Sequence, residues 1–158
     1  MGAAVAPPGI ERDRRLDHRW PRVRAVVDTN VVAYYLLGTP GFASEAKDFW
    51  RRVVDPLAPA LWEAEFANVV WMAARAGVVA PEDAPAKLDY AGQLGIHSIA
   101  SRTLWRAALR RALESGVAAY DTLFVELADR ESLPLATFDE RLLRSFPLIA
   151  KRPKTLGA

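Results

Sequence analysis

The sequence predicts an α/β protein with three layers, α/β/α, around a central and mainly parallel sheet. Three observations predict this fold. Short apolar runs rich in β-branched residues recur along the chain, segments with helical spacing separate them, and glycine or proline stands at many junctions. Strands that alternate with helices pair in parallel, because each crossover returns the chain to the same end of the sheet. The 158 residues, 51% of them hydrophobic, suffice for one such domain with a buried core.

The first half of the predicted domain runs from a buried strand to a long helix. The segment VRAVVD has the β-branched character of a buried strand, and the apolar helix after it ends at the turn GTPG. Gly77 marks the end of the long helix. In chain order we expect a strand at 23–28, helices at 30–37 and 43–55, an extended segment at 56–60 and a helix at 61–77.

The second half is divided by residues that start and stop helices. Pro81 stands at the entry of one helix and Gly95 at its exit. For the next helix, Ser101 is a candidate cap and Gly116 a stop. The expected order is a helix at 81–95, a strand at 96–100, helices at 101–116 and 118–132, a strand at 133–139, a helix at 140–146 and a last strand at 147–150.

Charge and composition divide the chain into a domain with two basic ends. Residues 1–22 contain three of the eleven prolines and show no periodicity, so we expect a flexible basic extension there. The domain is expected at 23–150, and a basic carboxy-terminal tail at 151–158. Basic ends can neutralise phosphates, but ordinary solvated tails have the same composition.

Composition excludes several classes of site and location. Without cysteine the chain has neither disulfides nor a thiolate zinc site, which suits a reducing compartment. No leader pattern opens the sequence, and no run approaches the roughly 18 apolar residues of a membrane span. We therefore expect a soluble, cytoplasmic protein without a membrane partner. His18 and His97 have no partners for a hydrolytic triad, and no glycine-rich nucleotide-binding motif occurs.

Four acids stand where a site is expected. Asp28 closes the first predicted strand and Asp139 closes the strand PLATFD, so parallel strands would bring both to one edge of the sheet. Asp121 opens the helix DTLFVELADR, and Glu65 lies on a mainly apolar helix face. Taken singly, each aspartate is explained by helix capping and Glu65 by rotation to solvent. Their number, each beside apolar segments, favours one shared site.

Electrostatics sets what a shared site requires. Two carboxylates about 5 Å apart repel by roughly 3 kcal/mol at an effective dielectric near 20, and four exceed what marginal stability tolerates. A cation or protons must therefore accompany them. Oxygen ligands without cysteine or clustered histidine select Mg²⁺ or Mn²⁺. The implied chemistry is metal-assisted hydrolysis of a phosphodiester by a water molecule.

Three segments resemble, in the same order, the successive motifs of the PIN-domain ribonucleases. They are VVDTNVVAYYLL, PALWEAEFANVVW and YDTLFVELADRESLPLATFDERLL, and the resemblance covers about residues 23–150. It is strongest to the VapC-type toxins of VapBC toxin–antitoxin pairs. The resemblance implies a PIN-like fold and a metal-dependent endoribonuclease that hydrolyses RNA with Mg²⁺ or Mn²⁺. It also implies a cognate antitoxin and a homodimer.

Carried over residue by residue, the resemblance assigns the candidate site. The catalytic and metal-holding acids would be Asp28, Glu65, Asp121 and Asp139. Glu63 is the one competitor for the helical position, and the spacing to Asn68 favours Glu65. Side chains that fix the carboxylates would be Asn30 and Thr137, with Thr29 and Thr122 as weaker candidates. A hydroxyl beside a helix start is often only a cap.

Two further groups of residues admit two interpretations each. Four arginines on one predicted helix either guide RNA phosphates or are simply solvated. They are Arg102, Arg106, Arg110 and Arg111. The tryptophans exceed what a small core needs, and we expect one cluster of them to support a homodimer or bind a partner peptide. Those on predicted helices are Trp50, Trp62, Trp71 and Trp105.

Three alternative functions stay open at this point. A phosphatase of the haloacid dehalogenase type would use Asp28 as nucleophile, but it needs a second aspartate where this chain has Asn30. A PIN-like domain that only binds RNA or protein would be marked by loss of an acid, and all four are present. An RNA-processing or DNA-directed nuclease without an antitoxin is not separated from the toxin by the sequence.

Overall fold

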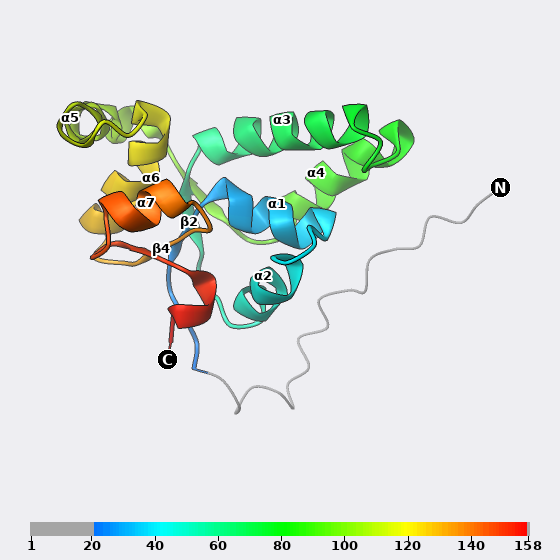
Figure 1. The fold of residues 1–158 in the computed structure, drawn as a ribbon, viewed down its shortest axis with the longest axis horizontal. Coiled ribbons are helices and arrows are strands. Elements are labelled where there is room, and N and C mark those ends of the chain that lie inside the picture. Colours follow the sequence, from blue (N-terminus) through cyan, green and yellow to red (C-terminus); the bar gives the residue numbers. More distant parts are fainter. Residues whose placement is uncertain (1–20, 158) are drawn as a thin grey trace.

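The computed structural model describes residues 21–157 and arranges them around a five-stranded sheet (Figure 1). All neighbouring strands run parallel, in the spatial order β3-β2-β1-β4-β5. The strands are β1 (Val26–Val27), β2 (Leu57–Pro59), β3 (His97–Ile99), β4 (Leu135–Ala136) and β5 (Ala150–Lys151). The predicted parallel sheet is confirmed, and β1 occupies its centre.

Seven α-helices between residues 21 and 157 cover the sheet, together with short 3₁₀ turns. Helices α1 to α4 pack on one another to one side, whereas α6 contacts β1, β2 and β4 on the other and carries α5 outside it (Figure 1). The predicted three-layer α/β/α fold is therefore confirmed. The α-helices are α1 (Thr29–Leu37), α2 (Ala43–Trp50), α3 (Leu61–Arg75), α4 (Ala84–Gly92), α5 (Trp105–Ser115), α6 (Ala119–Arg130) and α7 (Glu140–Ser145), and the 3₁₀ turns are η1 (Pro81–Asp83), η2 (Ser101–Thr103) and η3 (Pro153–Thr155). No helix in this part of the chain has the length and apolar character needed to cross a membrane.

Two predicted helix boundaries were wrong because tertiary contacts take over the backbone. α2 ends at Trp50 instead of residue 55, since Val53 forms a parallel bridge to Val23 and the neighbouring amides hydrogen-bond across it. Ser101 begins the separate turn η2, so it does not cap α5, which starts four residues later. The predicted stop at Gly116 is confirmed, where a φ of 72° closes α5 in the left-handed conformation that glycine adopts at little cost.

The segment 151–157, expected as a basic carboxy-terminal tail, packs against the rest of the domain. It completes β5, and Leu156 is buried. The Nη2 and Nε groups of Arg152 donate to the Glu45 carboxylate of α2 over 2.6 and 3.2 Å. Of the extension expected at 1–22, only the last two residues belong to the described part of the chain.

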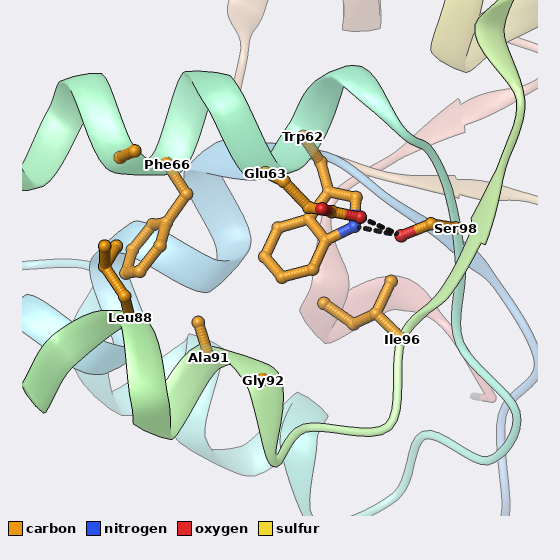
Figure 2. A pocket seen from close by; sticks show the side chains of 9 residues that line it. Trp62, Glu63, Phe66, Leu88, Ala91, Gly92, Ile96 and Ser98 are labelled. Carbon is orange, nitrogen blue, oxygen red and sulfur yellow. Dashed lines mark hydrogen bonds between the residues drawn. The ribbon is translucent and has the colours of Figure 1, made fainter.

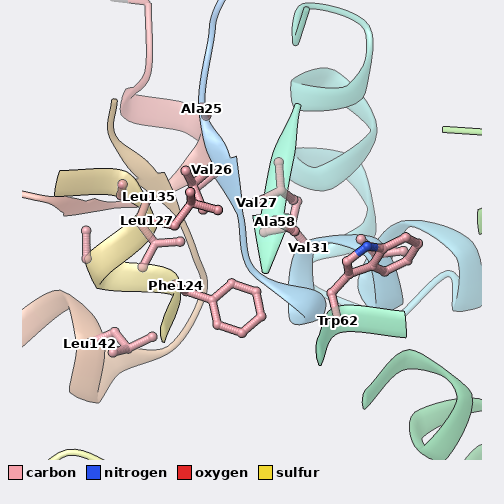
Figure 3. Close-up of a cluster of buried hydrophobic side chains, with 14 of the residues drawn as sticks. Ala25, Val26, Val27, Val31, Ala58, Trp62, Phe124, Leu127, Leu135 and Leu142 are labelled. Atoms are coloured by element: carbon pink, nitrogen blue, oxygen red, sulfur yellow. The ribbon is translucent and has the colours of Figure 1, made fainter. Parts of the chain in front are cut away.

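The hydrophobic core lies on both sides of β1 (Figure 3). Figure 3 shows Phe124 and Leu127 of α6 next to one side, and Val31 of α1 and Trp62 of α3 toward the other. Val26 and Val27 themselves are at most 1% exposed. Burial of each large apolar side chain contributes about 1.5–3 kcal/mol, so β1 is among the most firmly held segments. The residue that follows β1 is therefore fixed in space.

Candidate active site

Asp28 directly follows the central strand β1. Side chains, and not the backbone amides of a helix end, donate the hydrogen bonds that hold its carboxylate. Its backbone amide donates to the carbonyl of Ala136 over 3.0 Å, which continues the pairing of β1 with β4. Asp28 occupies the N-cap position of α1, but its carboxylate makes no capping hydrogen bond. Instead, Oδ2 accepts from Thr137 Oγ1 at 2.7 Å and from Asn30 Nδ2 at 3.1 Å. The capping explanation for Asp28 is thereby excluded.

Asn30 and Thr137 tie the ends of β1 and β4 together. The amide oxygen of Asn30 accepts from the backbone N–H of Phe138 at 3.2 Å, which fixes its amide nitrogen toward Asp28. The buried hydroxyl of Thr137 donates to Asp28 and accepts from the backbone N–H of Asp139 at 2.9 Å. Both residues therefore make the carboxylate contacts that the sequence analysis expected of them.

Asp139 does cap a helix, yet it keeps one oxygen available. Its Oδ1 accepts from the backbone amides of Arg141 and Leu142 at the start of α7, at 2.7 and 3.1 Å. Its Oδ2 takes no hydrogen bond from the residues that the structure describes. Capping and participation in a site are thus compatible for this residue.

The two glutamates of α3 point to different places. Oε1 of Glu65 accepts from Thr29 Oγ1 at 2.9 Å, so Glu65 lies beside the residue that follows Asp28. Oε1 of Glu63 accepts from Ser98 Oγ at 2.6 Å at the other side of the helix. The choice of Glu65 over Glu63 agrees with this geometry, and Thr29 acts on Glu65 as its position suggested.

Asp121 and Thr122 are adjacent in α6 but face different environments. Asp121 is half-buried in the first turn of α6, two residues after its start and not at the opening residue that was expected. Thr122 is fully buried and donates to the carbonyls of Ala108 and Ala119 at 2.6 and 3.1 Å. The expectation that Thr122 orients a carboxylate is not met, because its hydroxyl joins α6 to α5.

Burial and mutual charge shift three of the four acids in the same direction. Burial is the largest cause that raises the pKa of Asp28 to about 7; the Thr137 hydrogen bond opposes it, and the charges of the other three acids add to it. Burial also raises the pKa of Glu65, against the hydrogen bond from Thr29 and with the charge of Asp121. The pKa of Asp121 is raised by burial and by Asp139. The four acids therefore form one electrostatic cluster.

This carboxylate cluster, defined as Asp28, Glu65, Asp121 and Asp139, is an oxygen-only donor set. In the range 21–157 no three acidic or histidine side chains are gathered closely enough to hold an ion between them. The donor chemistry nevertheless fits a hard divalent cation, because carboxylates without sulfur or imidazole are what Mg²⁺ and Mn²⁺ prefer. An alternative relief of the repulsion is protonation, which the raised pKa values favour.

Some expected RNA-contacting and interface residues have other roles. Arg111 donates to Glu126 at 2.7 Å and to Asp129, so it joins α5 to α6 and is not available to phosphates. Trp50 and Trp62 are core residues. Trp71 and Trp105 are each 54% exposed; Arg75 of the same helix lies over the Trp71 ring, and Arg102 of η2 lies over the Trp105 ring.

A separate pocket of about 380 Å³ opens between α3 and α4 beside β3 (Figure 2). Its wall is mainly apolar, and one polar chain crosses it: Trp62 Nε1 donates to Ser98 Oγ, which donates to Glu63. Sequence reasoning missed this pocket because Ser98 and Leu88 belong to unremarkable segments. The acidic residue two positions before Glu65, which is Glu63, was the signal in the sequence that could have indicated this pocket. The lining residues are Trp62, Glu63, Phe66, Ala67, Leu88, Ala91, Gly92, Ile96 and Ser98.

This chain is similar in sequence to one known ribonuclease and in structure to two solved proteins. Ribonuclease VapC3 of Pyrobaculum aerophilum is 33% identical over 89 residues, which make up 54% of this chain and 66% of that protein. The match thus spans slightly less than two thirds of the relative. The crystal structure of PAE2754 from Pyrobaculum aerophilum superposes with a TM-score of 0.64 at 22% identity, covering 84% of this chain and 91% of that one. VapBC2 of Rickettsia felis, bound to a DNA fragment from its promoter, gives 0.57 at 15% identity, covering 82% and 98%.

These neighbours, both below 25% identity, establish the fold alone. The family match shows more than the fold: residues 25–146, well over half of the chain, match the PIN domain, and this range includes all four acids of the carboxylate cluster. With the parallel sheet and the cluster at the ends of β1 and β4, this match shows that the chain belongs to the PIN domain family.

Proposed function

We propose that this chain is a metal-dependent endoribonuclease, the VapC-type toxin of a toxin–antitoxin pair, which hydrolyses phosphodiester bonds of RNA. The carboxylate of Asp28 carries the proposal: burial and three neighbouring acids raise its pKa to about 7. A fold maintains such a cluster at a cost to its own stability, and clusters of this kind concentrate at functional sites. The name of the Pyrobaculum relative, a ribonuclease, supports RNA as the substrate. An RNA-cleaving toxin acts in the cytoplasm.

The carboxylate cluster is suited to Mg²⁺ or Mn²⁺. Mg²⁺ usually binds through one or two protein carboxylates and keeps several waters. Direct coordination of the ion by three carboxylates is therefore not required. We assign Asp28, Asp121 and Asp139 to hold the cation directly or through water. When bound, the cation would supply positive charge beside the scissile phosphate and favour ionisation of the attacking water.

The chain's own side chains prepare the site for that step. Thr137 and Asn30 both donate to Oδ2 of Asp28, which leaves Oδ1 free to face the cluster. Thr29 holds Oε1 of Glu65, which leaves Oε2 to accept a proton from the attacking water. These hydrogen bonds favour the charged carboxylates, in opposition to burial.

We propose that the pocket between α3 and α4 receives the cognate antitoxin. The Rickettsia neighbour is a VapBC complex, which supports a partner of this kind. The pocket offers an apolar wall, the 43% exposed Leu88 at its rim and the Glu63 carboxylate, whose Oε2 takes no hydrogen bond from the described residues. Its chemistry fits a large apolar side chain next to a basic one.

We propose that a homodimer forms on the outer face of α5. Trp105, Leu109 and Leu113 are 54%, 52% and 79% exposed and follow one another at four-residue spacing. Side chains at this spacing form one stripe along a helix, and an exposed apolar stripe is the usual contact face between two helices. A second copy of α5 would cover it.

Cleavage of RNA by the purified chain should require Mg²⁺ or Mn²⁺ and stop in EDTA. Glu65→Gln and Asp28→Asn should each lower the rate by about 100-fold or more, because each removes a charge from the carboxylate cluster. Glu63→Gln is the matched control, since it makes the same change two residues away on α3. The assay follows a labelled RNA beside a DNA of the same sequence. Cleavage that persists in EDTA would contradict the proposal; cleavage of DNA alone would favour a DNA-directed nuclease, and no cleavage a binding domain.

In EDTA, the free energy of unfolding should fall as pH rises from about 4 through 7. Folded Asp28 has a pKa of about 7 against 3.8 for the free side chain, so the folded state binds the extra proton and loses that stability as it ionises. Asp28→Asn should therefore stabilise the protein at pH 8 by on the order of 2–4 kcal/mol relative to wild type, and less at pH 5. Urea unfolding followed by tryptophan fluorescence measures this. Mg²⁺ should reduce the difference in the free energy of unfolding between Asp28→Asn and wild type. Equal stabilisation by Asp28→Asn at pH 5 and at pH 8 would refute the explanation.

A cognate antitoxin should inhibit cleavage by binding at the α3–α4 pocket. Leu88→Glu should weaken its binding at least about 10-fold, because a charge would enter an apolar contact. Leu148→Glu, at a side chain that is 92% exposed elsewhere, is the control. Binding is measured by titration calorimetry with the purified partner. Unchanged affinity of Leu88→Glu would exclude this pocket as the docking site.

Leu109→Glu should convert the dimer to a monomer, since it places a carboxylate at the centre of the α5 stripe. Light scattering coupled to size-exclusion chromatography reports the mass, and Leu148→Glu again serves as control. A wild-type chain that elutes as a monomer at high micromolar concentration would disprove the homodimer.

A further inference from the structure

Arg141 is a basic residue held directly beside the carboxylate cluster. It is the second residue of α7, and its backbone N–H donates to Oδ1 of Asp139 at 2.7 Å. The distance between its backbone and Asp139 is therefore fixed by the cap itself. Its place in the sequence carries no signal of a site, because a cation two residues after an aspartate is common in helices.

The side chain of Arg141 reaches across to the segment that carries Asp121. Its Nη2 donates to the carbonyl of Gly116, the residue that ends α5 just before α6 begins. The charge of Arg141 also lowers the pKa of Asp121, against burial and Asp139. The guanidinium thus acts on Asp121 through its charge, while the backbone of the same residue holds Asp139.

Most of the guanidinium is still available for another ligand. A guanidinium has five N–H donors, and within the described residues the Gly116 contact is the one hydrogen bond that this side chain makes. The residue as a whole is exposed. A planar fork that is held at one N–H and open at the others is preorganised for the paired oxygens of a phosphate.

The carboxylate cluster creates a need for such a cation. Four acids repel an approaching RNA phosphate, and one divalent ion offsets only part of their charge. Two of the arginines considered for phosphate contacts are engaged elsewhere: Arg111 of α5 is paired with Glu126 and Asp129, and Arg102 of η2 lies over the Trp105 ring. Arg141, by contrast, acts through its charge on Asp121 of the cluster and is anchored by its hydrogen bond to Gly116.

We propose that Arg141 binds a backbone phosphate of the RNA at the mouth of the carboxylate cluster and so positions the substrate strand for cleavage. This inference rests on the proposed ribonuclease function. The carbonyl of Gly116 sets the orientation of the guanidinium, and its free N–H groups take the non-bridging phosphate oxygens. Arg141 is a substrate-binding residue and performs no proton transfer.

The test uses the full chain carrying Asp28→Asn, in Mg²⁺, so that bound RNA is not consumed. The probe is a fluorescein-labelled single-stranded RNA of twelve nucleotides, and its binding is followed by anisotropy over a range of salt. Arg141→Gln keeps a donor for the Gly116 carbonyl but loses the charge. It should weaken binding about 10-fold and reduce the slope of log K against log salt by about 0.7, the value for one phosphate contact on a single strand. Arg141→Lys should restore the slope more fully than the affinity, because lysine keeps the charge but not the fork.

Arg144→Ala is the matched control, because it removes an exposed arginine one turn further along α7. It should change the affinity less than about twofold. In the otherwise wild-type chain, Arg141→Gln should raise KM for the RNA more than it lowers kcat. Thermal melting of every variant shows whether the fold is kept.

The outcomes separate the two proposals. If the wild-type chain cleaves RNA but Arg141→Gln binds and cleaves like wild type with the same salt slope, the role of Arg141 is refuted and the ribonuclease stands. A loss of kcat alone, with KM and slope unchanged, also refutes it, because that pattern indicates a structural bracing of α7. If the wild-type chain neither binds nor cleaves RNA, the proposed function itself fails.

Discussion

The partly buried carboxylate of Asp28, at the end of the central strand, is the constraint on which the rest of the structure depends. The register that pairs Val27 with Ala136 brings Thr137 to this carboxylate, and the start of α1 brings Asn30. A carboxylate in this place opposes folding unless it is hydrogen-bonded and its charge is compensated. The apolar burial of β1 on both sides offsets that cost. The core and the candidate active site are therefore one arrangement: the same strand that is held most firmly also aims the acid.

The position of Asp121 depends on a second set of contacts, on the far side of the sheet. Thr122 binds the carbonyl of Ala108, and Arg111 of α5 pairs with Glu126 and Asp129 of α6. These contacts fix α6 against α5 and so determine where the first turn of α6 lies. Such partly buried polar pairs contribute little net free energy of folding, but removal of one partner alone destabilises the protein. They are therefore effective at specifying one arrangement of two helices.

The sequence alone predicts the parts of this protein that follow from local pattern plus one topological rule. Asp28 and Asp139 close apolar runs, and a parallel sheet must bring such ends to one edge. Prediction from the sequence fails where a side chain has two plausible neighbours. Nothing in the α6 pattern indicates that Thr122 faces α5. Ser101 has the chemistry of a helix cap but begins a separate turn. The end of α2 and the packed segment 151–157 were missed for a related reason, since Val53 and Leu156 are held by distant parts of the chain.

The Thr137 to Asp28 hydrogen bond joins residues 109 positions apart. During synthesis on the ribosome, β1 and α3 leave the exit tunnel long before β4, so the nascent polypeptide carries Asp28 without its partner. Only after residue 139 has emerged does the last acid arrive, together with the hydroxyl that orients the first. Under the proposed ribonuclease function, the site would therefore be complete only near the end of the chain's own translation.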